Sequence, residues 1–207
     1  MLDRNLKRWE LALMFGLLCG LLGGFWLDRE QTQLADRVIR FHVIANSDSP
    51  EDQALKLQVR DRVLAETETF YPERATLEEA RAALEAHLEE LAAAGQAAVT
   101  EAGRSEPVTA RLERCWFPTK EYDGFALPAG EYTALRVVIG EGQGQNWGCV
   151  AFPPLCLEAA SETVDEAAAA GYFSPGQAAL ITEEDRGYVL KFRAMELLGE
   201  WKGLLCR

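Results

Sequence analysis

Residues 38–50 read VIRFHVIANSDSP, and this stretch decides the fold because a strand passes directly into the start of a helix. The odd positions from 39 to 45 are all apolar, whereas Arg40 and His42 share the other face. This period of two predicts a β-strand with one core face. Ser49 is placed to cap a helix whose first position suits Pro50.

Two helices are predicted after this strand. The first should run from Pro50 to about Phe70 and bury an apolar stripe. The second begins at Thr76, which has capping-box spacing to Glu79, and Gly95 offers it a stop or a kink.

From Pro107 the apolar period returns to two, which predicts a strand leading into Trp116 and Phe117. A long loop should join it to strands at 131–140 and 146–152, which are separated by the Gly-rich turn EGQGQ. Because these strands follow one another closely in the sequence, we expect them to form an antiparallel meander. Helices are expected at 161–170 and 188–205. The predicted class is α/β (α+β), a single domain with helices on a small mixed or antiparallel sheet, in the order βααβββαα.

The amino terminus predicts an export or anchoring signal. Residues 11–27, LALMFGLLCGLLGGFWL, carry no charge and follow a basic segment. We interpret residues 1–27 as a signal peptide or membrane anchor, 28–37 as a polar stalk and 38–207 as an extracytoplasmic signalling domain. The net charge of −12 becomes −13 without residues 1–27, which carry three basic and two acidic residues (−12 − 1 = −13). This negative charge would repel the phosphate backbone of a nucleic acid, so nucleic-acid binding is not expected.

Four of the five cysteines follow the apolar segment, where an extracytoplasmic location permits disulfides. Their spacing does not resemble a zinc site, and no cofactor is expected. We predict that Cys149 pairs with Cys156, because Pro153 and Pro154 bend the chain between them. The pairing of Cys115 and Cys206 stays open.

An extracytoplasmic cell-wall or peptide hydrolase is the alternative function, with Cys149 as nucleophile, His42 as base and Asp48 as orienting acid. Cys149 lies within an apolar strand, which favours a structural role. The acidic cluster that begins at Asp48 is better explained by helix capping than by calcium binding. The glycines of EGQGQ precede a strand, so they are interpreted as turn residues and not as a phosphate-binding loop.

Two long stretches resemble the stage II sporulation protein R family: RFHVIANSDSPEDQALKLQVRD at 40–61 and FPTKEYDGFALPAGEYTALRVVIGEGQGQNWGCVAFPPLC at 117–156. The uncharged amino-terminal segment and the chain length fit as well. The resemblance implies a protein that is exported from the forespore into the space between the two membranes. There it would activate a membrane-embedded aspartic protease of the mother cell, which processes the sigma-E precursor. The chain itself would not be an enzyme.

The resemblance also implies a set of partner-binding residues: His42, Asn46, Asp48, Ser49, Lys120, Tyr122, Asn146 and Trp147. One departure is visible, because Trp147-Gly148 stands where two adjacent tryptophans are expected. We expect the contact surface at 140–147 together with 46–49, where glycines and the absence of apolar residues suggest a flexible tip. Trp147 would either anchor an interface or point into the core. The remaining alternative is a purely structural envelope domain.

Overall fold

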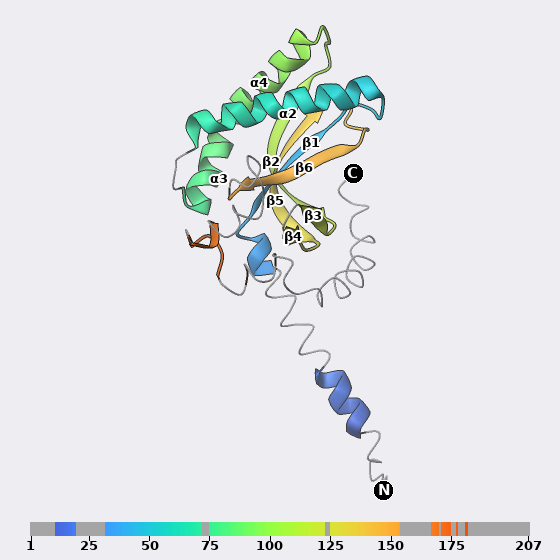
Figure 1. Cartoon of the computed structure of the whole chain (residues 1–207), viewed down its shortest axis with the longest axis vertical. Helices are drawn as coiled ribbons and strands as arrows, with labels where there is room; N and C mark the ends of the chain where they lie inside the picture. Colours follow the sequence, from blue (N-terminus) through green and yellow to red (C-terminus); the bar gives the residue numbers. More distant parts are fainter. Residues whose placement is uncertain are drawn as a thin grey trace, which may run out of the picture.

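A computed structural model describes residues 11–19, 32–71, 75–122, 125–153, 167–169, 171–174, 177 and 181. Along the described part of the chain one strand is followed by three helices and then by five strands, and these three helices gather on one side of the sheet (Figure 1). The predicted α/β class is confirmed. The elements, in chain order, are β1 (Ile39–Ile44), α2 (Pro50–Phe70), α3 (Leu77–Ala86), α4 (Leu88–Glu101), β2 (Val108–Phe117), β3 (Lys120–Tyr122), β4 (Phe125–Leu127), β5 (Gly130–Ile139) and β6 (Asn146–Phe152).

The sheet is mixed, with the strand order β2-β5-β1-β6. Strand β1 pairs with β5 in parallel and with β6 antiparallel, and β2 pairs with β5 antiparallel. The predicted meander is therefore wrong, because β1 lies between β5 and β6. Close spacing in sequence favoured a hairpin there, but β1 is apolar enough to occupy the centre of the sheet.

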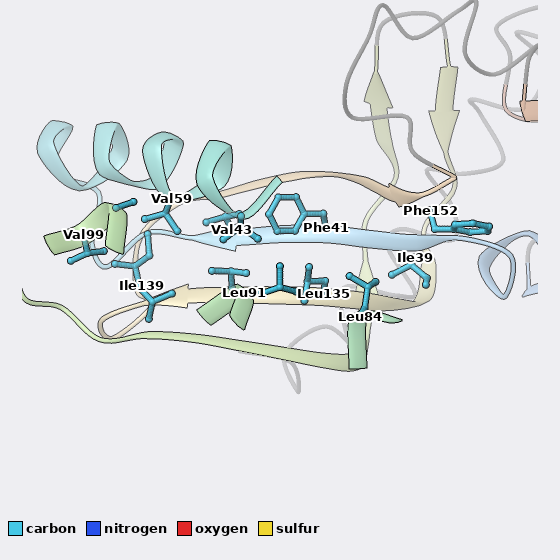
Figure 2. Close-up of a cluster of buried hydrophobic side chains, with 14 of the residues drawn as sticks. Ile39, Phe41, Val43, Val59, Leu84, Leu91, Val99, Leu135, Ile139 and Phe152 are labelled. Atoms are coloured by element: carbon cyan, nitrogen blue, oxygen red, sulfur yellow. The ribbon is translucent and has the colours of Figure 1, made fainter. Parts of the chain in front are cut away.

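The larger core lies between the sheet and the helices. Figure 2 shows Phe41 and Val43 of β1 beside Val59 of α2, with Leu91 and Val99 of α4 in the same cluster. Each of these side chains is at most 1% exposed. The odd positions of β1 thus form the predicted core face, and the helical stripe completes it.

A second core covers the opposite face, so β1 has two buried faces instead of the one predicted. Leu34 is fully buried there, together with Tyr132 of β5 and Phe125 of β4. Because Leu34 belongs to this core, the folded part includes residues from the predicted polar stalk. Strand β5 is also covered on both sides, since Leu135 faces the larger core.

Both predicted helix caps are present. Ser49 is the N-cap of α2, and its Oγ accepts a hydrogen bond from Asp52 N at 3.1 Å. Thr76 and Glu79 form the capping box of α3. The next boundary differs from the prediction: the break falls at His87, and Gly95 lies within α4. A Cβ at Gly95 would stand 2.9 Å from a methyl group of Val108, so this glycine permits close packing of α4 on β2.

The long loop expected after β2 contains a two-stranded sheet, β3 with β4, that sequence periodicity did not predict. Each strand has three residues, too few to establish an alternation. Residues 167–169 are helical within the predicted 161–170 helix, whereas the predicted 188–205 helix lies outside the described residues. Residues 11–19 are helical, and among the described residues no helix is both long and apolar enough to span a membrane.

Two leucines of α2 provide a test of this packing. Leu55 is 3% exposed and Leu57 is 40% exposed. We expect Leu55→Ala to lower the free energy of unfolding by about 2–5 kcal/mol, because it leaves a cavity under α2. The matched variant Leu57→Ala should cost less than about 1 kcal/mol. Urea denaturation of both variants measures this, and equal losses would contradict the placement of α2.

Candidate functional site

The loop between β5 and β6 crosses the carboxyl end of β1 and contacts the loop that leads into α2. Gly144 N donates a hydrogen bond to Ala45 O at 2.9 Å, and Gln143 N donates to Asn46 O at 3.1 Å. The sheet order forces this crossing, because β5 and β6 flank β1 and their connected ends lie at the same edge. We call residues 45–49 and 140–145 the crossover junction.

Three predicted contact residues have their polar atoms engaged inside this junction. Asn46 Oδ1 accepts from Glu141 N at 3.0 Å, and Asp48 Oδ1 accepts from Gln145 N at 2.6 Å. Ser49 caps α2. Hydrogen bonds within the chain are therefore enough to explain why these three polar residues occur here, and no partner protein is needed to explain them. Their predicted partner contacts stay predictions.

The junction rests on the buried carboxylate of Asp52, which is 4% exposed. Its Oδ2 accepts from Ser47 Oγ at 2.6 Å and from Asn46 Nδ2 at 3.0 Å, and Arg104 Nη2 lies 2.6 Å from its Oδ1. The hydrogen bonds from Ser47 and Asn46, followed by Arg104, lower the pKa of Asp52. Lys56 Nζ, also buried, donates to Gln145 O at 3.1 Å.

The expected flexible tip is a closely packed loop. A Cβ at Gly144 would stand 2.2 Å from the carbonyl oxygen of Ser47, and one at Gly140 would stand 2.1 Å from Asn46 Oδ1. Gly140 also has a φ of +59°, which few other residues adopt. The glycines therefore let two loops approach each other closely.

Trp147 lies between the two positions considered for it, because its ring is neither fully buried in the core nor fully exposed. The ring is half-buried and meets Phe41 edge-on, with centroids 5.8 Å apart. The Arg60 guanidinium lies over the ring, 4.9 Å from its centroid, and forms an ion pair with Asp61 at 2.7 Å. Trp147 therefore packs at the margin of the larger core and keeps part of its ring exposed.

His42 lies on the opposite face of the sheet from Trp147. Its ring meets Phe117 edge-on at 5.3 Å. Burial lowers the pKa of His42 from 6.5 to about 4, the side-chain hydrogen bond with Asn146 opposes this shift, and the charges of Arg136 and Arg40 add to it. His42 is therefore neutral near pH 7.

Tyr122 reaches the same face through Arg40, whose Nη2 donates to the Tyr122 hydroxyl at 3.0 Å. Lys120, two residues earlier on β3, is exposed. Asn46 comes six residues after Arg40, which is about 20 Å of extended chain at ~3.3 Å per residue. Asn46, Asp48 and Ser49 thus form one group at the crossover junction. The second group lies around Arg40 and contains His42, Lys120, Tyr122 and Asn146, which is hydrogen-bonded to His42. Trp147 belongs to neither group, because it lies on the opposite face of the sheet from His42.

Sequence reasoning missed Arg40 as part of this second group, because the apolar alternation predicts one core face for β1 and places Arg40 on the other face. It is 3% exposed. The available signal was a charged residue inside a run rich in β-branched residues, since such runs form central strands whose two faces are both covered.

The hydrolase set does not assemble. Cys149 is opposite Phe41 in the register and so lies on the helix-covered face, whereas His42 lies on the other face. Cys149 is also disulfide-bonded. Cys156 and Cys206 lie outside the described residues, so the predicted pairing with Cys156 stays a prediction. Within the described ranges, no three His, Cys, Asp or Glu side chains are placed to hold a metal.

The sequence that forms this fold matches an established family. Residues 35–162 match the family described as stage II sporulation protein R, and the chain belongs to this family. Membership supports a role in sporulation.

The chain is similar to stage II sporulation protein R of Bacillus subtilis (strain 168), with 36% identity over 148 residues. The aligned part covers 70% of this chain and 66% of that protein, slightly less than two thirds of its length. No solved structure matches.

The close approach at the crossover junction predicts an effect of one added methyl group. Gly144→Ala should lower the free energy of unfolding by about 1–3 kcal/mol, because its Cβ would overlap the Ser47 carbonyl. Gly130→Ala is the matched control, since its Cβ would meet its nearest atom at 3.6 Å. Chemical denaturation compares the two, and a Gly144→Ala chain as stable as the control would contradict the described junction.

The lowered pKa of His42 predicts acid sensitivity. Between pH 6.5 and about 4 the unfolded chain binds a proton that folded His42 does not, so stability falls as the pH falls. The loss by about pH 4.5 should be about 2–3 kcal/mol. Urea denaturation across this range should show the loss in the wild type and in His87→Gln, and a smaller loss in His42→Gln. If His42→Gln leaves the pH dependence of the free energy of unfolding unchanged, the lowered pKa of His42 is contradicted.

Proposed function

We propose that this chain is an exported sporulation signal that activates a membrane-embedded aspartic protease, which then processes the sigma-E precursor in the mother cell. The observation that carries the proposal is the family match over residues 35–162, because it spans β1 to β6 and both groups of candidate residues. The chain acts in the space between the forespore and mother-cell membranes, and residues 1–27 export or anchor it.

The surface around Trp147 supports a contact with a polypeptide. Tryptophan and arginine are among the residues most enriched at interface positions where a few side chains dominate binding. Trp147 and Arg60 stack at the surface, and the guanidinium forms an ion pair with Asp61. Leu57, 40% exposed, lies one helical turn from Arg60 on the same side of α2. A preformed surface of this kind loses little side-chain entropy when a partner binds.

Reconstitution in a cell that does not sporulate tests the proposal. The full chain, the protease and the sigma-E precursor are expressed together, and each is omitted in turn. We expect precursor cleavage when all three are present, and loss of cleavage when the chain is omitted or when a catalytic aspartate of the protease is replaced. Equal cleavage without the chain would overturn the proposal.

The same assay predicts a separable effect of Trp147. Because the ring is half-buried, Trp147→Ala should cost about 1–3 kcal/mol of stability. If the exposed part contacts the protease, precursor cleavage at matched folded protein should fall about tenfold or more. Trp116→Ala, which removes another half-buried tryptophan on β2, is the matched control and should retain cleavage. Full cleavage by a folded Trp147→Ala chain would remove Trp147 from the contact surface.

A further inference from the structure

Arg40 is a buried guanidinium without an anionic partner among the described residues. It is 3% exposed, and the Tyr122 hydroxyl accepts the one side-chain hydrogen bond found for it in the described part of the chain. Its Nε and Nη1 are buried and have no hydrogen-bond partner. The guanidinium lies over Phe117 at 4.2 Å and Tyr132 at 5.1 Å, but such contacts satisfy the face of the group and not its in-plane N–H donors.

Two neighbours share this deficit. His42 is two residues along β1 on the same face, and Arg136 is its partner in the register with β5. Five buried side-chain N or O atoms in the described part of the chain lack a partner, and four belong to Arg40, His42 and Arg136. We call these three residues the Arg40 row. An unsatisfied buried polar group is rare in native proteins, so a concentration of them at one place requires a physical explanation.

The charges of the row indicate which ligand fits. Arg136 Nη1 pairs with Glu113 at 2.7 Å, so one positive charge of the two arginines is compensated. His42 is neutral near pH 7. The remaining charge is that of one guanidinium, which a monoanion would balance. A carboxylate carries that charge and accepts hydrogen bonds from guanidinium and imidazole N–H groups.

The row is open at one end. The Arg136 side chain is 25% exposed, and His42 is half-buried. Gly148 stands opposite His42 on β6 and places no side chain over the imidazole. Asn146, exposed at the start of the same strand, marks the rim. A small carboxylate can therefore approach from the side of His42 and Arg136.

We propose that Arg40, His42 and Arg136 form a binding site for a single carboxylate, supplied by an acidic side chain or the C-terminus of a polypeptide partner. That this partner is the protease rests on the function proposed above. The site lies on the sheet face opposite Trp147, so it is a second point of contact and not an extension of the Trp147 surface.

Nuclear magnetic resonance of the full-length chain in micelles tests the site directly. The chain has two histidines, so His42 is the reporter and His87 is an internal control. The probes are acetyl-Gly-Asp-Gly-amide, acetyl-triglycine with a free carboxylate, and acetyl-triglycine amide, at an ionic strength held constant with chloride. We expect one or both acidic peptides to shift the His42 signals saturably while His87 stays unchanged. A response to the first alone identifies an acidic side chain, and a response to the second alone identifies a chain end.

Variants establish the role of the row. Arg136→Gln should weaken binding of the acidic peptide at least tenfold, whereas Arg81→Gln removes an exposed charge from α3 and should leave it unchanged. Thermal unfolding checks that both variants fold. The carboxylate site is overturned if no peptide shifts the His42 signals. It is also overturned if the neutral peptide or chloride shifts these signals as much as the acidic peptides do. These binding experiments do not depend on precursor cleavage. The carboxylate site can therefore be wrong while the proposed function is right, and the proposed function can be wrong while the site is right.

Discussion

The buried carboxylate of Asp52 holds together segments that are far apart in the chain. It lies in the first turn of α2, accepts hydrogen bonds from Asn46 and Ser47 of the β1–α2 loop, and pairs with Arg104 after α4. A carboxylate that is 4% exposed requires such compensation. The same loop then receives the β5–β6 connection, so the position of β6 and of Trp147 depends on this one charge being satisfied.

The two faces of β1 differ in chemistry. The face toward α2 is apolar and closely packed, as Phe41 and Val43 show (Figure 2). The opposite face buries Arg40 beside aromatic rings of the second core. Packing alone explains the first face. The second face buries polar groups whose hydrogen bonds are incomplete, as the unpartnered nitrogen atoms of Arg40, His42 and Arg136 show.

The candidate site could be predicted in part. The stretches at 40–61 and 117–156 contain both groups of candidate residues, and the structure brings Asn46, Asp48 and Asn146 to one edge of the sheet. It separates them from Lys120 and Tyr122 at the other end of β1. Residues adjacent in a motif need not be adjacent on the surface, because a strand advances about 3.3 Å per residue.

The sequence by itself determined the α/β class, the strand at β1, the caps at Ser49 and Thr76, and the helical stripe that covers one face. These features depend on local periodicity and on hydrogen bonds within a few residues. Tertiary structure alone decided that β1 separates β5 from β6, that Gly95 permits close packing, and that Arg40 is buried. Strand order and burial depend on contacts between residues distant in sequence, because a segment can be covered only by what the rest of the chain places against it.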